Sequence, residues 1–181
     1  MQLMLASVLV LTLAVDRPVL ATDSPASFCA TLNGNYSGTD SSASGTAHIV
    51  IDTETDLVDV SINVSGIDLD GLSTVLRDLP VGPIHLHQYP AHHHSTDAQV
   101  ILAMPVPYGS HYQPTPSGFR VELRGYSYSD GAELLGSELS AEDFLAAIEG
   151  GDVILNIHTN HFPDGAISGV VQRACAAGPT Y

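Results

Sequence analysis

The chain has 181 residues, of which 20 are acidic and 5 basic, and its formal net charge is −15. Such a length suits one domain, and the charge excludes a protein that holds nucleic acid or anionic lipid through basic side chains. Because only 2 cysteines stand against 9 histidines, a four-cysteine zinc site and an iron–sulfur cluster are also excluded, and imidazole is the commonest potential metal ligand.

The N-terminal stretch predicts a signal peptide. Residues 3–14 are almost entirely apolar, but this run is too short to span a bilayer comfortably. The small residue Ala21 suits signal peptidase, so we expect residues 1–21 to be removed and residues 22–181 to form a single mature domain. An uncleaved anchor helix is the alternative. After cleavage we expect a secreted or periplasmic protein that does not insert into the membrane.

The cysteines lie near the two ends of the mature domain. An exported chain can hold a disulfide. A bond between Cys29 and Cys175 would close a long loop and stabilise the fold by about 4–5 kcal/mol in the chain-entropy picture. A metal thiolate and two free buried thiols are the alternatives. We favour the disulfide, which removes sulfur from the potential metal ligands.

Most of the mature chain alternates between apolar and polar residues, which is typical of half-buried β-strands. The expected strands cover residues 46–51, 58–64, 83–89, 99–103, 119–124, 153–159 and 167–171. The first two are expected to form a hairpin around residues 52–56. Residues 105–117 hold four prolines and are expected to form a loop.

One short helix is expected near residues 140–149. Ser140 can cap its first turn, Asp143 stands in a capping-box position, and glycines follow its last turn. Short strands with a single helix predict a mostly β fold. We expect a Greek-key-like, two-sheet antiparallel β-sandwich.

The histidines are concentrated in two stretches, because 7 of the 9 fall within residues 85–94 and 158–161. His85 and His87 are two residues apart on an expected strand, so both side chains point to one face, with Cα atoms roughly 6.6 Å apart. His158 lies on a later strand, which can be a spatial neighbour of the first. These three histidines are expected to hold one metal ion. The alternative is a set of solvated histidines on an acidic surface.

The ligand chemistry favours copper, with zinc as the alternative. Neutral imidazole suits both ions, and the expected disulfide leaves no thiolate to compete. His93, between His92 and His94, or His161 is expected to supply a fourth ligand. Hydrogen bonds from a neighbouring side chain are expected to hold His158 in place, and the candidates for this role are Asn156 and Thr159.

Several motifs, in their order along the chain, resemble the CHRD domain family, which is named for modules in chordin and occurs in exported microbial proteins. They are a Gly-Thr-Ala sequence before an alternating strand, a His-x-His strand, a helix ending in glycine, Asn156-Ile157-His158-Thr159, and Pro163-Asp164-Gly165-Ala166-Ile167. The resemblance covers roughly residues 28–172. It implies a β-rich domain and, by analogy with chordin, protein binding. Ser168 and Val170 depart from the family's pattern, which usually has arginine and glutamine there.

The histidine pattern also resembles that of copper–zinc superoxide dismutase, in which a His-x-His strand, a loop histidine and a late strand histidine surround copper. This resemblance implies redox activity toward superoxide, although a strongly acidic chain repels an anionic substrate at long range. Three functions therefore stay open, and whether the protein is an enzyme is left undecided. They are a copper-binding protein, a copper-only superoxide dismutase, and an interaction module that needs no metal.

Overall fold

The computed structural model describes residues 25–89 and 101–173. The expected signal peptide at residues 1–21, the three histidines His92, His93 and His94, and Cys175 lie outside the described residues. The predictions made for them therefore stay predictions. Within the described part of the chain, no helix is both long enough and apolar enough to cross a membrane.

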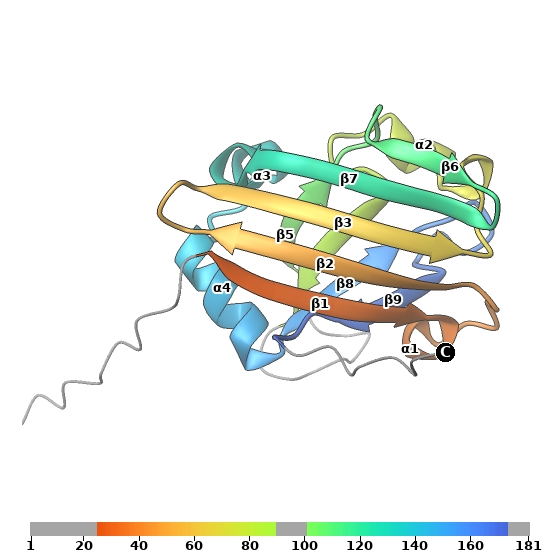
Figure 1. The fold of residues 1–181 in the computed structure, drawn as a ribbon, viewed down its shortest axis with the longest axis horizontal. Helices are drawn as coiled ribbons and strands as arrows, with labels where there is room; N and C mark the ends of the chain where they lie inside the picture. The colour runs from red at the N-terminus through yellow and green to blue at the C-terminus, as the bar shows by residue number, and fades with distance from the viewer. Residues whose placement is uncertain (1–24, 90–100, 174–181) are drawn as a thin grey trace, which may run out of the picture.

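Strands and a few short helices make up the described chain (Figure 1). The strands are β1 (Ala26–Asn33), β2 (Ser44–Asp52), β3 (Leu57–Ser65), β4 (Ile84–Gln88), β5 (Ile101–Val106), β6 (Tyr112–Thr115), β7 (Gly118–Ser127), β8 (Val153–Ile157) and β9 (Ile167–Val170). The helices are α1 (Gly34–Ser37), the 3-10 turn η1 (Leu69–Gly71), α2 (Thr74–Arg77), α3 (Tyr128–Leu135) and α4 (Ala141–Gly150). The expected mostly β fold is confirmed.

The strands form one antiparallel sheet of 9 strands in the order β5-β4-β8-β9-β1-β2-β3-β7-β6. Figure 1 shows this sheet curled into a half-barrel, with β1, β2, β3 and β7 in front and β5, β8 and β9 crossing behind them. The expected division into two sheets with Greek-key order is not confirmed. The reason is that β1 and β9 are hydrogen-bonded neighbours, which makes the front and back strands one continuous sheet.

The front and back strands are joined where β1 meets β9. Cys29 in β1 and Gln172 just after β9 exchange two backbone hydrogen bonds of 2.9 Å each. Gly169 in β9 lies so close to β1 that a Cβ atom on it would be 2.1 Å from the carbonyl oxygen of Thr31. Glycine therefore permits a backbone approach that any side chain would block. Alternating hydrophobicity does not reveal which strands pair, so the sequence pattern could not predict this junction.

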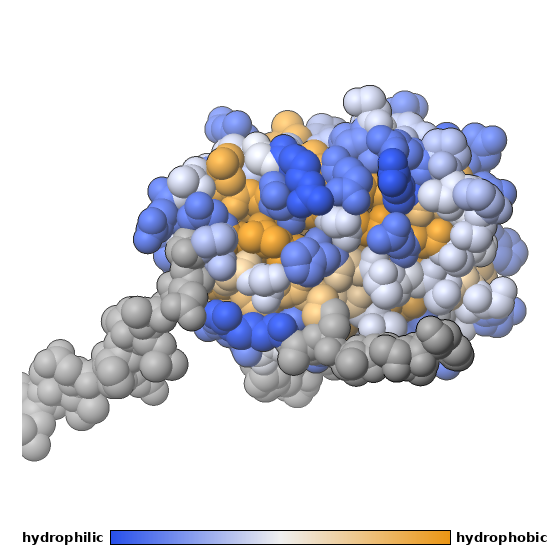
Figure 2. All heavy atoms as spheres, in the orientation of Figure 1, coloured by the Kyte–Doolittle hydropathy of each residue, from blue (hydrophilic) through white to orange (hydrophobic). Residues whose placement is uncertain are grey.

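Apolar side chains from both parts of the sheet fill the interior. The alternate apolar residues of β2 and β3 are buried, among them Ala47, Ile49, Ile51, Val58, Val60 and Ile62. At one end of the half-barrel, the ring of Tyr128 in α3 stacks on that of Phe144 in α4, with the ring centroids 5.0 Å apart. The outer face of the front strands carries mostly hydrophilic side chains with smaller apolar patches between them (Figure 2). The half-barrel is thus stabilised chiefly by the apolar surface that it encloses.

Most of the expected elements are confirmed, including the hairpin, which corresponds to β2 and β3, and the helix, which is α4. Ser140 caps α4 by accepting a hydrogen bond of 3.1 Å from the backbone N–H of Asp143. The expectation of a single helix is wrong, because α1, η1, α2 and α3 are present besides α4. The strands β1 and β6 were not expected either, and β6 lies inside the proline-rich segment that predicted a loop. Pro105 and Pro114 lie in β5 and β6, the two edge strands. An edge strand tolerates proline because one side of its backbone makes no ladder hydrogen bonds.

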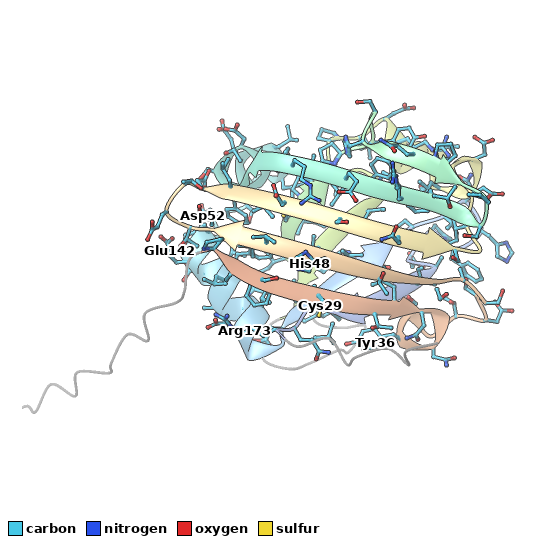
Figure 3. All side chains as sticks on the ribbon, in the orientation of Figure 1. Cys29, Tyr36, His48, Asp52, Glu142 and Arg173 are labelled. Atoms are coloured by element: carbon cyan, nitrogen blue, oxygen red, sulfur yellow. The ribbon has the colours of Figure 1, made fainter. Side chains whose placement is uncertain are left out.

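The expected disulfide concerns Cys29, which is buried in β1 (Figure 3). Its strand pairing with Gln172 brings the chain shortly before Cys175 next to it. This arrangement is compatible with the expected bond. Because Cys175 lies outside the described residues, the disulfide stays a prediction.

Candidate metal centre

Three histidines from two neighbouring strands converge at one place. His85 and His87 lie on β4, and His158 directly follows β8. β4 and β8 are antiparallel neighbours, and the backbone N–H of His158 extends their pairing by donating to the carbonyl oxygen of Pro83 at 2.9 Å. Each of the three side chains offers a ring nitrogen such that these nitrogens all lie within 4.8 Å of one another. This pairing makes the strand of His85 and His87 a spatial neighbour of the strand that leads to His158, as expected.

The alternation along β4 explains why these side chains share a face. Ile84 and Leu86 are fully buried in the core, so His85 and His87 point to the opposite side of the sheet. That side is also covered, because His85 is only 4 % exposed and His158 only 7 %. His87 is half-buried. The three rings therefore lie in a sheltered site, and His87 is the most exposed of them.

The rings are close enough to share one ion. The centroids of His85 and His158 are 4.4 Å apart with their planes nearly parallel, at 19°. The ring of His87 lies 4.6 Å from that of His85 and 6.1 Å from that of His158, tilted against both. Nothing but imidazole contributes to this group, since no cysteine or carboxylate of the described residues belongs to it.

Backbone carbonyls determine which ring nitrogen of two histidines is free. Nδ1 of His85 lies 3.1 Å from the carbonyl oxygen of Gly82, and Nδ1 of His158 lies 2.7 Å from that of Pro163. A carbonyl oxygen can only accept, so each Nδ1 carries the proton and each Nε2 keeps its lone pair. This is the arrangement that metal-binding histidines usually have.

Two ring nitrogens of this group have no hydrogen-bond partner among the described residues. They are Nε2 of His158 and Nδ1 of His87, and both atoms are buried. Buried polar atoms are nearly always satisfied, so an orphaned one indicates an absent water or ion. Lone pairs that meet in a sheltered space fit a metal ion that prefers nitrogen ligands.

Burial keeps these histidines neutral. Desolvation, followed by the neighbouring His158 and His87, lowers the pKa of His85 to about 3. Desolvation and the proximity of His158 lower the pKa of His87 to about 4. The pKa of His158 is lowered as well, chiefly by burial. All three rings are therefore uncharged at neutral pH, which is the form that binds metal.

The hydrogen bonds of Asn156 and Thr159 go to the loop that follows His158 and not to the His158 ring. The Nδ2 atom of Asn156 donates to the carbonyl oxygen of Asp164 at 3.2 Å, and Oγ1 of Thr159 accepts from the backbone N–H of Phe162 at 3.0 Å. Both bonds fix the segment that carries Pro163. The direct partners of the rings are thus the backbone carbonyls of Gly82 and Pro163, which sequence reasoning missed because a carbonyl carries no side-chain signal.

His161 is the other candidate for a fourth ligand. It is exposed and lines an open pocket of about 310 Å³ together with Asp68, Asp70 and Phe162. It does not belong to the group formed by His85, His87 and His158. His93 lies outside the described residues, so the structure brings together three of the five expected ligands.

The comparisons with known proteins support one of the two resemblances. The family model described as the CHRD domain matches residues 28–171. No curated protein and no solved structure matches the chain significantly, so the likeness to superoxide dismutase has no support from them. Since the family model spans most of the sequence, the chain belongs to the CHRD domain family.

Proposed function

We propose that this chain is an exported copper-binding protein in which His85, His87 and His158 hold the ion. The observation that carries the proposal is the convergence of three ring nitrogens within 4.8 Å of one another in a largely buried site. Two of these rings are fixed by backbone carbonyls so that Nε2 is free. A site arranged in advance loses less ordering entropy when the ion binds.

Copper fits this donor set better than other common ions. Imidazole binds copper, zinc, nickel and iron, and for one set of nitrogen ligands copper has the highest affinity among the divalent ions of this series. The net charge of −15 attracts any cation at long range. Zinc is the alternative, because a set of three imidazoles also suits it.

The protein's own residues would hold, orient and shelter the ion. His85 and His158 present their Nε2 lone pairs from buried rings, and His87 is the most exposed of the three. His93, His92, His94 or His161 is the proposed source of a fourth ligand. Copper, when bound, would supply one-electron chemistry, and activity toward superoxide is part of the proposal. The expected disulfide and a secreted or periplasmic location belong to it too.

Electron paramagnetic resonance of the Cu(II)-loaded protein tests the copper site. We expect nitrogen hyperfine structure that is lost in the double variant His85→Ala/His158→Ala. The variant His48→Ala is the matched control, since His48 is exposed on the front strands and contacts Ser27 at 2.8 Å (Figure 3). An unchanged signal in the double variant would sink the proposal.

The three consecutive histidines need a separate control, because they can bind copper by themselves. The triple variant His92→Asn/His93→Asn/His94→Asn is expected to retain the nitrogen signal of the site. Changed spectral parameters in this variant would identify one of them as the fourth ligand, and the same comparison with His161→Asn tests the other candidate. Complete loss of the signal in the triple variant, with the double variant unaffected, would place the copper outside the proposed centre.

The second candidate is an interaction module that needs no metal, and the family match is compatible with it. In that case the histidines are buried polar residues that serve the fold only. A ligand that binds the native state alone raises its stability, by about 2.7 kcal/mol at a hundredfold excess over Kd. A melting temperature that does not change on adding copper or zinc would therefore support this candidate and contradict the first.

A further inference from the structure

Gly165 occupies a position that only glycine can hold. Its φ is +125°, a backbone conformation that residues with a side chain rarely adopt. A Cβ atom on Gly165 would also lie 2.2 Å from Oδ1 and 2.5 Å from Nδ2 of Asn156. The turn that follows Pro163 thus packs its backbone directly against the Asn156 carboxamide.

Asn156 is the buried residue against which Gly165 packs. It is 9 % exposed, lies on β8 opposite His85, and donates from Nδ2 to the carbonyl oxygen of Asp164. Its Oδ1 atom is buried without a hydrogen-bond partner among the described residues. A buried amide oxygen without a partner is costly, so this carboxamide is held in an orientation that its own hydrogen bonding does not fully explain.

The same turn carries the carbonyl that orients His158. Pro163 and Asp164 are consecutive, so the bond from Asn156 to Asp164 and the bond from His158 to Pro163 hold adjacent carbonyl groups. Two backbone bonds complete the turn, from Gly165 N–H to Phe162 at 3.1 Å and from Ala166 N–H to Ile157 at 2.7 Å. A shift of the turn at Gly165 would therefore move the acceptor away from Nδ1 of His158.

We propose that Gly165 and Asn156 form a positioning pair that selects the ring tautomer of His158 with a free Nε2. The hydrogen bond printed for Asn156 goes to the turn and not to the ring of His158. The pair acts through the Pro163 carbonyl, which keeps the proton on Nδ1. The consequence for metal affinity rests on the proposed function, whereas the consequence for the tautomer holds in the metal-free protein.

The test uses the mature chain and ¹⁵N spectroscopy of its histidine rings without metal. The wild-type protein is expected to show His158 protonated on Nδ1, and Gly165→Ala is expected to show a mixture of tautomers. The matched control is Gly151→Ala, because Gly151 also has a positive φ, +78°, but nothing lies within 4 Å of its missing Cβ. Gly151→Ala introduces similar backbone strain without a collision of the new Cβ atom, and it is expected to leave the tautomer of His158 unchanged.

A second variant keeps the test decisive if Gly165→Ala does not fold. Asn156→Ala removes the bond to Asp164 without straining the backbone, and it is expected to mix the tautomers as well. Its control is Ser168→Ala, since Ser168 is buried opposite Asn156 on β9 and its hydroxyl lies 2.6 Å from that of Ser37. If Asn156 has a purely structural role, Gly165→Ala and Asn156→Ala would lower the stability of the protein and leave the tautomer of His158 unchanged.

Copper affinity, measured by competition with a chelator, is the second readout. Loss of a group that orients a metal-binding histidine typically weakens binding about 10- to 100-fold, and we expect this for Gly165→Ala and Asn156→Ala. Wild-type tautomer and affinity in both variants would overturn the inference while leaving the proposed function intact. If the wild-type protein binds no copper, the proposed function fails, and the tautomer alone decides the inference.

Discussion

The Nδ1 atom of His158 lies 2.7 Å from the carbonyl oxygen of Pro163, which is only five residues further along the chain. Likewise, the Nδ1 atom of His85 lies 3.1 Å from the carbonyl oxygen of Gly82, which is three residues before it in the chain. In both cases a short turn next to a strand end supplies the acceptor. The free nitrogens of His85 and His158 are therefore determined by local backbone geometry, and backbone carbonyls orient these two rings.

The burial of uncharged histidines predicts that the metal-free protein loses stability in mild acid. In the unfolded chain His85 and His87 take up protons near pH 6.5, whereas in the folded chain their pKa values are about 3 and about 4. Between these values the unfolded state binds more protons, so the free energy of unfolding falls as the pH falls. Each group can contribute about 1.4 kcal/mol per pH unit within its window.

Urea unfolding between about pH 7 and pH 5 measures this dependence. Other groups also titrate, so the informative quantity is the difference from His85→Asn, which removes one of the buried groups. We expect a shallower loss of stability in that variant than in the wild-type protein. His48→Asn, at an exposed position, serves as the control, and equal slopes in the wild-type protein and His85→Asn would contradict the prediction.

The sequence predicts the local elements well and their spatial arrangement poorly. The alternation of Val58, Val60 and Ile62 is visible in the sequence and corresponds to a buried strand face. The junction of β1 and β9 depends on the absence of a side chain at Gly169, which a pattern of hydrophobicity does not record. One sheet and two packed sheets bury the same alternate residues, so the pattern cannot distinguish them.

For the candidate site too, the sequence predicts local features but not their arrangement in space. The spacing of His85 and His87 predicts a shared face, and the three-histidine group of the structure contains both. That His158 joins them follows from the pairing of β4 with β8, which only the fold supplies. The carbonyl acceptors and the role of Gly165 depend on backbone conformation, and for this reason they could not be inferred from residue types.

Gly169→Ala is expected to destabilise the protein strongly, because the new Cβ atom would lie 2.1 Å from the Thr31 carbonyl oxygen. Relieving this collision requires β1 and β9 to separate, and overpacking of this kind typically costs about 1–3 kcal/mol. Chemical denaturation measures the change. Gly71→Ala is the control, since the nearest atom to its missing Cβ is 3.7 Å away, and its effect should stay within about 0.5 kcal/mol. Equal effects of the two substitutions would contradict the single continuous sheet.

Thiol labelling, detected by the change in mass, and measurements of stability test the disulfide prediction. Labelling of the denatured, non-reduced protein with a thiol reagent is expected to modify neither Cys29 nor Cys175, and both after reduction. Cys29→Ser and reduced wild-type protein are expected to lose stability to a similar extent, by about 2–5 kcal/mol, with the long loop favouring the upper end of this range. Two reactive thiols in freshly purified, exported protein would show that the cysteines have another role.

Activity toward superoxide distinguishes an enzyme from a copper carrier, and its dependence on salt gives a second criterion. The copper-loaded protein is expected to consume superoxide faster than the His85→Ala/His158→Ala variant given the same amount of copper. Because the net charge of −15 repels an anion, the rate should increase with ionic strength, as the Debye length falls from about 30 Å at 0.01 M to about 8 Å at 0.15 M. A rate that falls with added salt would indicate a local positive field at the site. Equal rates for the two proteins would make the wild-type chain a copper-binding protein without this activity.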